Sequence, residues 1–156
     1  MSANKNPLFS GKGNAGYGVW TSSNTANTKS DGTGTIGTDM VKLFTADSTY
    51  GAFVSKLRLN PCASTAATAT TATVVRVYIS SIATGATTRN DTFLWQEYAL
   101  PSFTADQTTT AILPIEIALG FALPAGYTIL VSFHHAAAAN TSWAMAVVGG
   151  DYVEVP

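Results

Sequence analysis

The feature that most constrains the fold is an alternation of apolar and polar side chains that begins near residue 41 and continues to the C-terminal end. Successive side chains of a β-strand point to opposite faces, so a period of two predicts strands with one buried face. We expect five such faces, formed by Phe53, Leu57 and Leu59; by Val75, Val77 and Ile79; by Ile115, Ile117 and Leu119; by Tyr127, Ile129, Val131 and Phe133; and by Trp143, Met145 and Val147.

Turn-forming residues separate these runs, and no stretch shows a convincing helical period of 3.6 residues. Turns are predicted at Asn60-Pro61 and at residues 83–85, 89–91, 101 and 124–126. The pattern predicts about eight strands, at 41–46, 50–59, 73–80, 92–100, 111–119, 127–135, 141–149 and 151–155. Strands of this number, joined by loops of unequal length, favour an all-β, jelly-roll-like two-sheet β-sandwich over residues 40–156.

Residues 1–39 differ in composition from the rest of the chain. They are rich in Gly, Asn, Ser and Thr, and their apolar residues are too sparse to offset the entropy of ordering the segment. We therefore expect an extended N-terminal arm, mobile in the free protein, that docks on a partner. Its predicted anchors are the large apolar side chains Leu8, Phe9, Tyr17, Val19 and Trp20.

The charge content excludes several classes of protein. Only 11% of the 156 residues are charged and the formal net charge is −1, so no basic surface is available for nucleic acid. A weakly charged surface favours association, here a homotrimer. We expect no signal peptide and no membrane span, since no apolar run approaches 18 residues. The single cysteine, Cys62, excludes a disulfide within the chain.

No motif points to an enzyme or a cofactor. Residues 11–16 match G-x-G-x-x-G but lack the flanking strand and helix that a dinucleotide site needs. His134 and His135, as neighbours on a strand, point to opposite faces, so they form a metal site only if a threefold axis brings copies together. Neither Cys62 nor any pair of carboxylates stands in a catalytic pattern. We therefore expect no catalytic residues, no metal and no cofactor.

Five aromatic side chains leave a binding module open as an alternative. Aromatic rings stack on sugars, but they also pack in cores and at subunit contacts. The candidates for a glycan-binding surface are Trp95, Tyr98, Phe103, Trp143 and Tyr152.

From about residue 53 onward the chain resembles a family of small virion proteins of tailed bacteriophages. The resemblance lies in an ordered series of segments, and it does not include the residues before 40. The segments are 52–57 (AFVSKL), an Ala/Thr loop, 73–79 (TVVRVYI), 94–101 (LWQEYALP), 123–132 (LPAGYTILVS) and 148–152 (VGGDY).

The resemblance implies a jelly-roll-like virion component, often trimeric, that decorates a capsid or belongs to a tail or fibre. We expect a capsid decoration (cement) protein at the capsid surface, whose partners are its own copies and the major capsid protein. The absence of a long coiled-coil shaft favours cement over a fibre. The alternative is a tail or head-fibre domain that binds a host glycan. Some strands look apolar on both of their faces, and their second faces give the predicted subunit interface. Its residues are Leu94, Tyr98, Leu130 and Val148.

Overall fold

The computed structural model describes residues 8–65, 68–107 and 112–154, and it contains only β-strands and connecting loops over these ranges. The all-β prediction is therefore confirmed. The strands are β1 (Leu8–Thr21), β2 (Gly34–Thr35), β3 (Val41–Thr45), β4 (Ala52–Ala63), β5 (Thr68–Ala69), β6 (Thr73–Ser80), β7 (Ala86–Thr87), β8 (Thr92–Leu100), β9 (Thr104–Ala105), β10 (Ile115–Leu123), β11 (Thr128–Phe133) and β12 (Thr141–Glu154).

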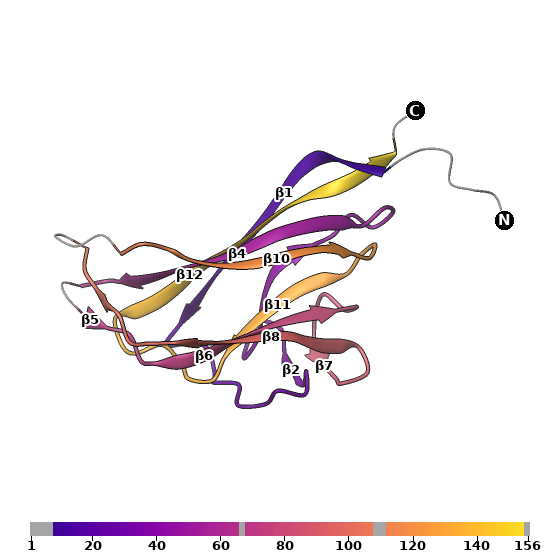
Figure 1. Ribbon diagram of the computed structural model, residues 1–156. Helices are drawn as coiled ribbons and strands as arrows, with labels where there is room; N and C mark the ends of the chain where they lie inside the picture. Colours follow the sequence, from indigo (N-terminus) through magenta and orange to yellow (C-terminus); the bar gives the residue numbers. More distant parts are fainter. Residues whose placement is uncertain (1–7, 66–67, 108–111, 155–156) are drawn as a thin grey trace.

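Eight of the described strands form two four-stranded antiparallel sheets that pack as a sandwich (Figure 1). The order is β1-β12-β4-β10 in one layer, called here the β1 sheet, and β3-β11-β6-β8 in the other, called the β3 sheet. Numbered along the chain, the eight strands run 1-8-3-6 and 2-7-4-5, which is the order of a jelly roll. The short pairs β2-β7 and β5-β9 lie outside the two sheets. The prediction of a jelly-roll-like sandwich is confirmed.

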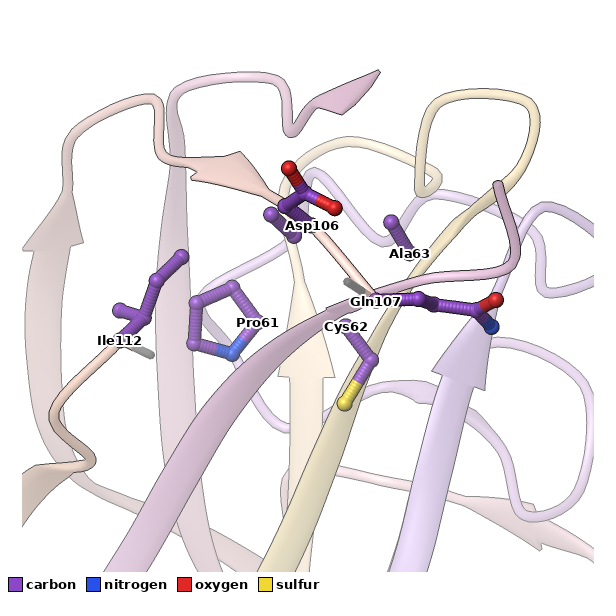
Figure 2. A pocket seen from close by; sticks show the side chains of 7 residues that line it. Pro61, Cys62, Ala63, Asp106, Gln107 and Ile112 are labelled. Atoms are coloured by element: carbon purple, nitrogen blue, oxygen red, sulfur yellow. The ribbon is translucent and has the colours of Figure 1, made fainter. Parts of the chain in front are cut away.

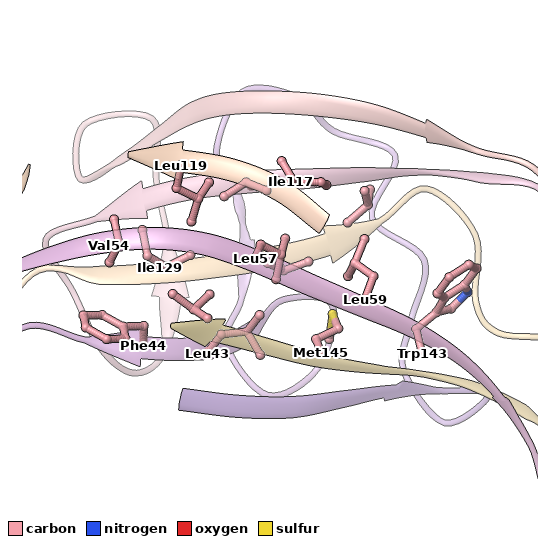
Figure 3. Packing of buried hydrophobic residues seen from close by; sticks show 14 of the residues in the cluster. Leu43, Phe44, Val54, Leu57, Leu59, Ile117, Leu119, Ile129, Trp143 and Met145 are labelled. Carbon is pink, nitrogen blue, oxygen red and sulfur yellow. The ribbon is translucent and has the colours of Figure 1, made fainter. Parts of the chain in front are cut away.

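The core fills the space between the two sheets (Figure 3). Leucine, isoleucine and valine side chains from both layers make up most of it, and three aromatic rings pack together in one part of it. The ring of Phe133 lies 5.1 Å from that of Trp20 and 6.0 Å from that of Trp143, measured between centroids. Most of the predicted inward faces are correct, because all of the alternating residues from Ile129 to Phe133 and from Trp143 to Val147 are buried.

A β-bulge in β4 overturns one predicted face. Leu57 and Leu59 are buried as expected, but Phe53 points outward and Val54 takes the inward position. The register of β4 shifts between Val54 and Lys56 against both of its neighbours. The extra residue reverses the side of the sheet to which the preceding side chains point.

The predicted turn at Asn60-Pro61 is wrong, because β4 continues through it to Ala63. Proline lacks an N–H group and is tolerated in strands mainly where no second neighbour needs that donor. In this sheet β10 begins at Ile115, opposite Leu59, so Pro61 has only β12 beside it, with Trp143 as its partner. The end of β4 is therefore an edge, and Pro61 fits there.

The outer face of the β3 sheet is covered by residues 22–40 of the same chain. Met40, Tyr78 and Leu130 form a second buried cluster on that face, with Ile36 and Leu94 packed against it. Two polar contacts hold the covering segment in place, since Arg76 Nη1 donates to Asn27 O at 2.8 Å and Tyr78 Oη donates to Lys29 O at 2.9 Å.

The structure also corrects the predicted boundary at residue 40. Residues 8–21 are not an arm apart from the sandwich but its edge strand β1, which pairs with β12 from Leu8 to Thr21. The inward positions of β1 include Gly16 and Gly18, and a Cβ at Gly16 would collide with the carbonyl oxygen of Leu43 in β3. Glycine thus lets β1 approach β3 closely, and the burial that holds the strand comes mainly from Trp20, which is fully buried.

Candidate functional site

The hollow that holds the only cysteine is lined by few reactive groups (Figure 2). Cys62 and Asp106 lie in its wall, together with apolar and amide side chains, and no histidine is among the lining residues. A cysteine nucleophile needs a base or another group that favours its thiolate. The Cys62 Sγ atom instead lies 3.6 Å from the carbonyl oxygen of Asn60. Among the described lining residues no histidine lies beside this thiol.

The two histidines follow β11 and lie close to each other. Their rings meet edge to face, with centroids 4.8 Å apart, and the Nδ1 atom of His134 is buried without a hydrogen-bond partner. Over the part of the chain that the structure describes, no group of three or more His, Cys, Asp and Glu side chains could hold a metal ion. The expectation of no metal site stays a prediction.

Two acidic side chains, Asp31 and Asp47, serve as turn caps. The hydroxyl and N–H groups of Thr33 donate to the Asp31 carboxylate at 2.6 and 3.1 Å, and these bonds lower the pKa of Asp31. The N–H groups of Tyr50 and Thr49 lower the pKa of Asp47 in the same way. These bonds favour the charged carboxylates and fix the loops around them.

The G-x-G-x-x-G match lies inside β1, where the chain is extended and paired with β12. A dinucleotide site needs these glycines in the turn that leads into a helix. Its rejection from the sequence is therefore correct.

The predicted anchors of the arm fall into three groups. Trp20 is buried in the core, and its Nε1 atom donates to His135 O at 3.1 Å, so it cannot contact a partner. Tyr17 and Val19 lie on the outer face of β1 and are exposed, Tyr17 by 84%. Leu8 and Phe9 belong to β1, and their side chains lie outside the described part of the structure.

The structure also divides the four residues of the predicted subunit interface. Leu130 is completely buried beneath the segment 22–40, and Leu94 packs against the same cluster, so both are used within the chain. The outer side of β11 around Leu130 therefore has a cover already, and including Leu130 in a subunit interface was wrong. Tyr98 and Val148 are exposed, but they belong to different sheets.

The first candidate interaction surface is a shallow hollow on the outer face of the β1 sheet. Tyr17 and Val19 of β1 form one wall, while Ala144 and Ala146 of β12 form the floor. Tyr17 lies opposite Ala146 and Val19 opposite Ala144 in the ladder. Arg58 and Asn60 of β4 border the other side. We call this surface the β1–β12 hollow.

The second candidate surface is a row of aromatic side chains on β8, an edge strand of the β3 sheet. Phe93, Trp95 and Tyr98 are 65%, 44% and 40% exposed. The Trp95 ring lies 4.4 Å from that of Phe121 in β10, so the row borders the side of the sandwich where β8 and β10 are edge strands. We call these three residues the β8 aromatic row. Sequence reasoning did not single out Phe93, although it stands in a correctly predicted strand.

Three of the five residues proposed for sugar stacking do not present an open ring. Trp143 is buried in the core, and Phe103 is partly buried and packs edge-on against it at 5.8 Å. Tyr152 is partly buried, which leaves Trp95 and Tyr98 as exposed candidates.

Comparison with known proteins gives no relative for this chain: no family model, no curated protein and no solved structure matches it. Among the described residues no helix is long and apolar enough to cross a membrane.

Proposed function

We propose that this chain is a non-enzymatic structural protein of a bacteriophage particle, a capsid decoration protein that binds the capsid surface as a homotrimer and stabilises it. The observation that carries the proposal is the pair of exposed apolar surfaces on a weakly charged jelly roll. The segment resemblance from residue 53 onward supplies the phage context.

The two surfaces suit lasting contact with other protein chains. Exposed apolar area that persists in a folded chain marks interaction sites, and aromatic side chains are enriched in the centres of protein interfaces. The β1–β12 hollow and the β8 aromatic row consist mainly of Ala, Val, Tyr, Phe and Trp side chains. Association through them depends on burial more than on charge.

The test is the number of copies of this chain in purified particles, measured by quantitative mass spectrometry against the major capsid protein. A copy number on the scale of the major capsid protein supports decoration of the capsid lattice. A copy number on the scale of the tail or fibre proteins moves the chain to those structures. Absence from washed particles contradicts the virion role.

A glycan-binding tail or head-fibre domain is the second candidate, because the β8 aromatic row places exposed rings side by side on one strand. Such a row can stack on the apolar faces of sugar rings. Binding to host-surface glycans that is lost on Phe93→Ser supports this function. Unchanged binding, or no binding by the native chain, opposes it.

A further inference from the structure

Between Trp143 and Val148, β12 is apolar on both of its faces. Its inward side chains, from Trp143 to Val147, belong to the core, and its outward side chains are Ala144, Ala146 and Val148. An antiparallel sheet with one face in water normally alternates apolar and polar residues, whereas strands covered on both faces are apolar throughout. The composition of β12 therefore indicates that something covers its outer face.

β11 provides the comparison within the same molecule. Its outer face carries Leu130 between Thr128 and Ser132, and there the structure contains the cover: Leu130 packs beneath Met40 of the segment 22–40. No described segment lies over Ala144 and Ala146, which instead form the floor of the β1–β12 hollow. Since the described residues supply no cover for β12, we take another chain as the candidate cover.

The chemistry of the hollow restricts what that cover can be. Its volume is about 250 Å³, and its only charged lining residue is Arg58 at the border, which lies 3.6 Å from Glu116. A charged partner would lose hydration without gaining an opposite charge from Tyr17, Val19 or the alanines. The hollow fits bulky, uncharged side chains.

A second copy of this chain offers such side chains at a different place on its surface. The β8 aromatic row projects from the side of the sandwich where β8 and β10 are edges, whereas the hollow lies at the β1 end of the other sheet. The only charged side chain on β8, Glu97, is already engaged with Arg76 at 2.6 Å. The row is therefore uncharged and aromatic, and the hollow is floored by small residues and charged only at its Arg58 border.

We propose that copies of this chain associate head to tail, with the β8 aromatic row of one copy packed into the β1–β12 hollow of the next. This inference rests on the homotrimer of the proposed function and names its contact surfaces. Two unlike surfaces at separate places produce a heterologous contact, which closes into a ring when the rotation permits. A contact of this kind leaves every hollow and every row in a trimer occupied.

The test uses two variants that each destroy one side of the contact. Ala144→Glu places a charge in the floor of the hollow, and Phe93→Glu places one in the aromatic row. The matched controls are Ala118→Glu, on the same face of the β1 sheet but outside the hollow, and Ala99→Glu, elsewhere on β8. Oligomeric state is measured by analytical ultracentrifugation on the full chain, with circular dichroism and urea unfolding to verify the fold.

Each interface variant is expected to weaken self-association at least about tenfold, while both controls associate like the native chain. The decisive sample is an equimolar mixture of Ala144→Glu and Phe93→Glu. One row and one hollow remain intact between the two variants, so the mixture should form heterodimers that neither variant forms alone. If Ala144→Glu does not fold, Tyr17→Glu replaces it, since that side chain is highly exposed.

Three results would overturn the head-to-tail contact. They are a native chain that stays monomeric at all concentrations tested, interface variants that associate normally, and a mixture that remains monomeric. The last result would indicate that each surface contacts its own kind or a different protein. These outcomes are separate from the copy-number test, because a chain absent from phage particles can still form this oligomer and a particle protein can lack it.

Discussion

Arg76 illustrates how a single buried side chain ties three parts of the fold together. It lies on β6 and is 7% exposed, yet its Nε atom donates to Glu97 Oε1 of β8 at 2.6 Å and its Nη1 atom donates to the Asn27 carbonyl at 2.8 Å. A buried guanidinium is tolerated when its donors are satisfied in this way. The same contacts hold the segment 22–40 against the β3 sheet.

Replacing Arg76 with alanine should lower the free energy of unfolding by about 2–3 kcal/mol, because the Asn27 carbonyl loses its partner and the cover over Tyr78 loosens. The control is Arg89→Ala, which removes an exposed ion pair with Asp31 and should cost less than about 1 kcal/mol. Urea unfolding of both variants measures the difference. Equal losses would mean that the covering segment does not depend on Arg76.

The Tyr78 hydroxyl gives the protein a predictable response to alkaline pH. Burial raises the pKa of Tyr78 above the ordinary value of 10.0, so the unfolded chain loses this proton at a lower pH than the folded chain. The stabilising contribution is therefore complete below about pH 10 and is lost progressively as the pH rises toward the folded-state pKa. Unfolding free energies measured from pH 8 to 11 should fall less steeply in Tyr78→Phe than in the native chain.

At the scale of strands, β1 depends on glycine where it crosses β3. Gly16→Ala puts a methyl group into the Leu43 carbonyl, a backbone atom that cannot rotate away, whereas Gly13 has open space around its Cβ position. We expect Gly16→Ala to cost about 2 kcal/mol or more and Gly13→Ala to be neutral or slightly stabilising. Thermal and urea unfolding of the two variants provide the comparison. A tolerated Gly16→Ala would mean that β1 can move away from β3 without loss.

β1 also shows which elements can be read from a sequence. The strands at 73–80 and 92–100 were predicted with correct bounds, because their β-branched and aromatic residues lie between clear turn signals. β1 was missed, because the inward positions Gly16 and Gly18 contribute no apolar side chain and the strand is held by the backbone ladder to β12 and by Trp20. The bulge in β4 could not be predicted either, because the composition of the strand gives no sign of it.

The candidate surfaces were only half predictable for a related reason. Alternation identifies Leu130 and Val148 equally as apolar residues on an outer face, but it cannot tell which face the chain itself covers. Coverage by the segment 22–40 depends on Met40 and on contacts to Asn27 and Lys29, which lie far in sequence from the strands that they reach. Only the three-dimensional arrangement separates a buried outer face from an open one.

At the scale of the whole molecule, residues 8–40 complete both layers of the sandwich. They supply the edge strand of the β1 sheet and the cover of the β3 sheet. Two of their own side chains, Trp20 and Met40, are completely buried. The sequence alone predicted that residues 1–39 form an arm apart from the sandwich. The structure leads to a different expectation, because their removal would expose Tyr78 and Leu130 to water and leave a large void beside Phe133.

Deleting residues 1–39 should therefore abolish cooperative folding. Loss of the buried Trp20 side chain alone costs about 3–5 kcal/mol in a typical core, a large part of the stability of one domain. The measurement is urea unfolding followed by tryptophan fluorescence and near-UV circular dichroism. The control is deletion of residues 1–7, which keeps every described residue and should leave the transition unchanged. A 1–39 deletion that still unfolds cooperatively near the native midpoint would mean that β1 and the segment 22–40 are dispensable to the sandwich, and would restore the separate docking arm.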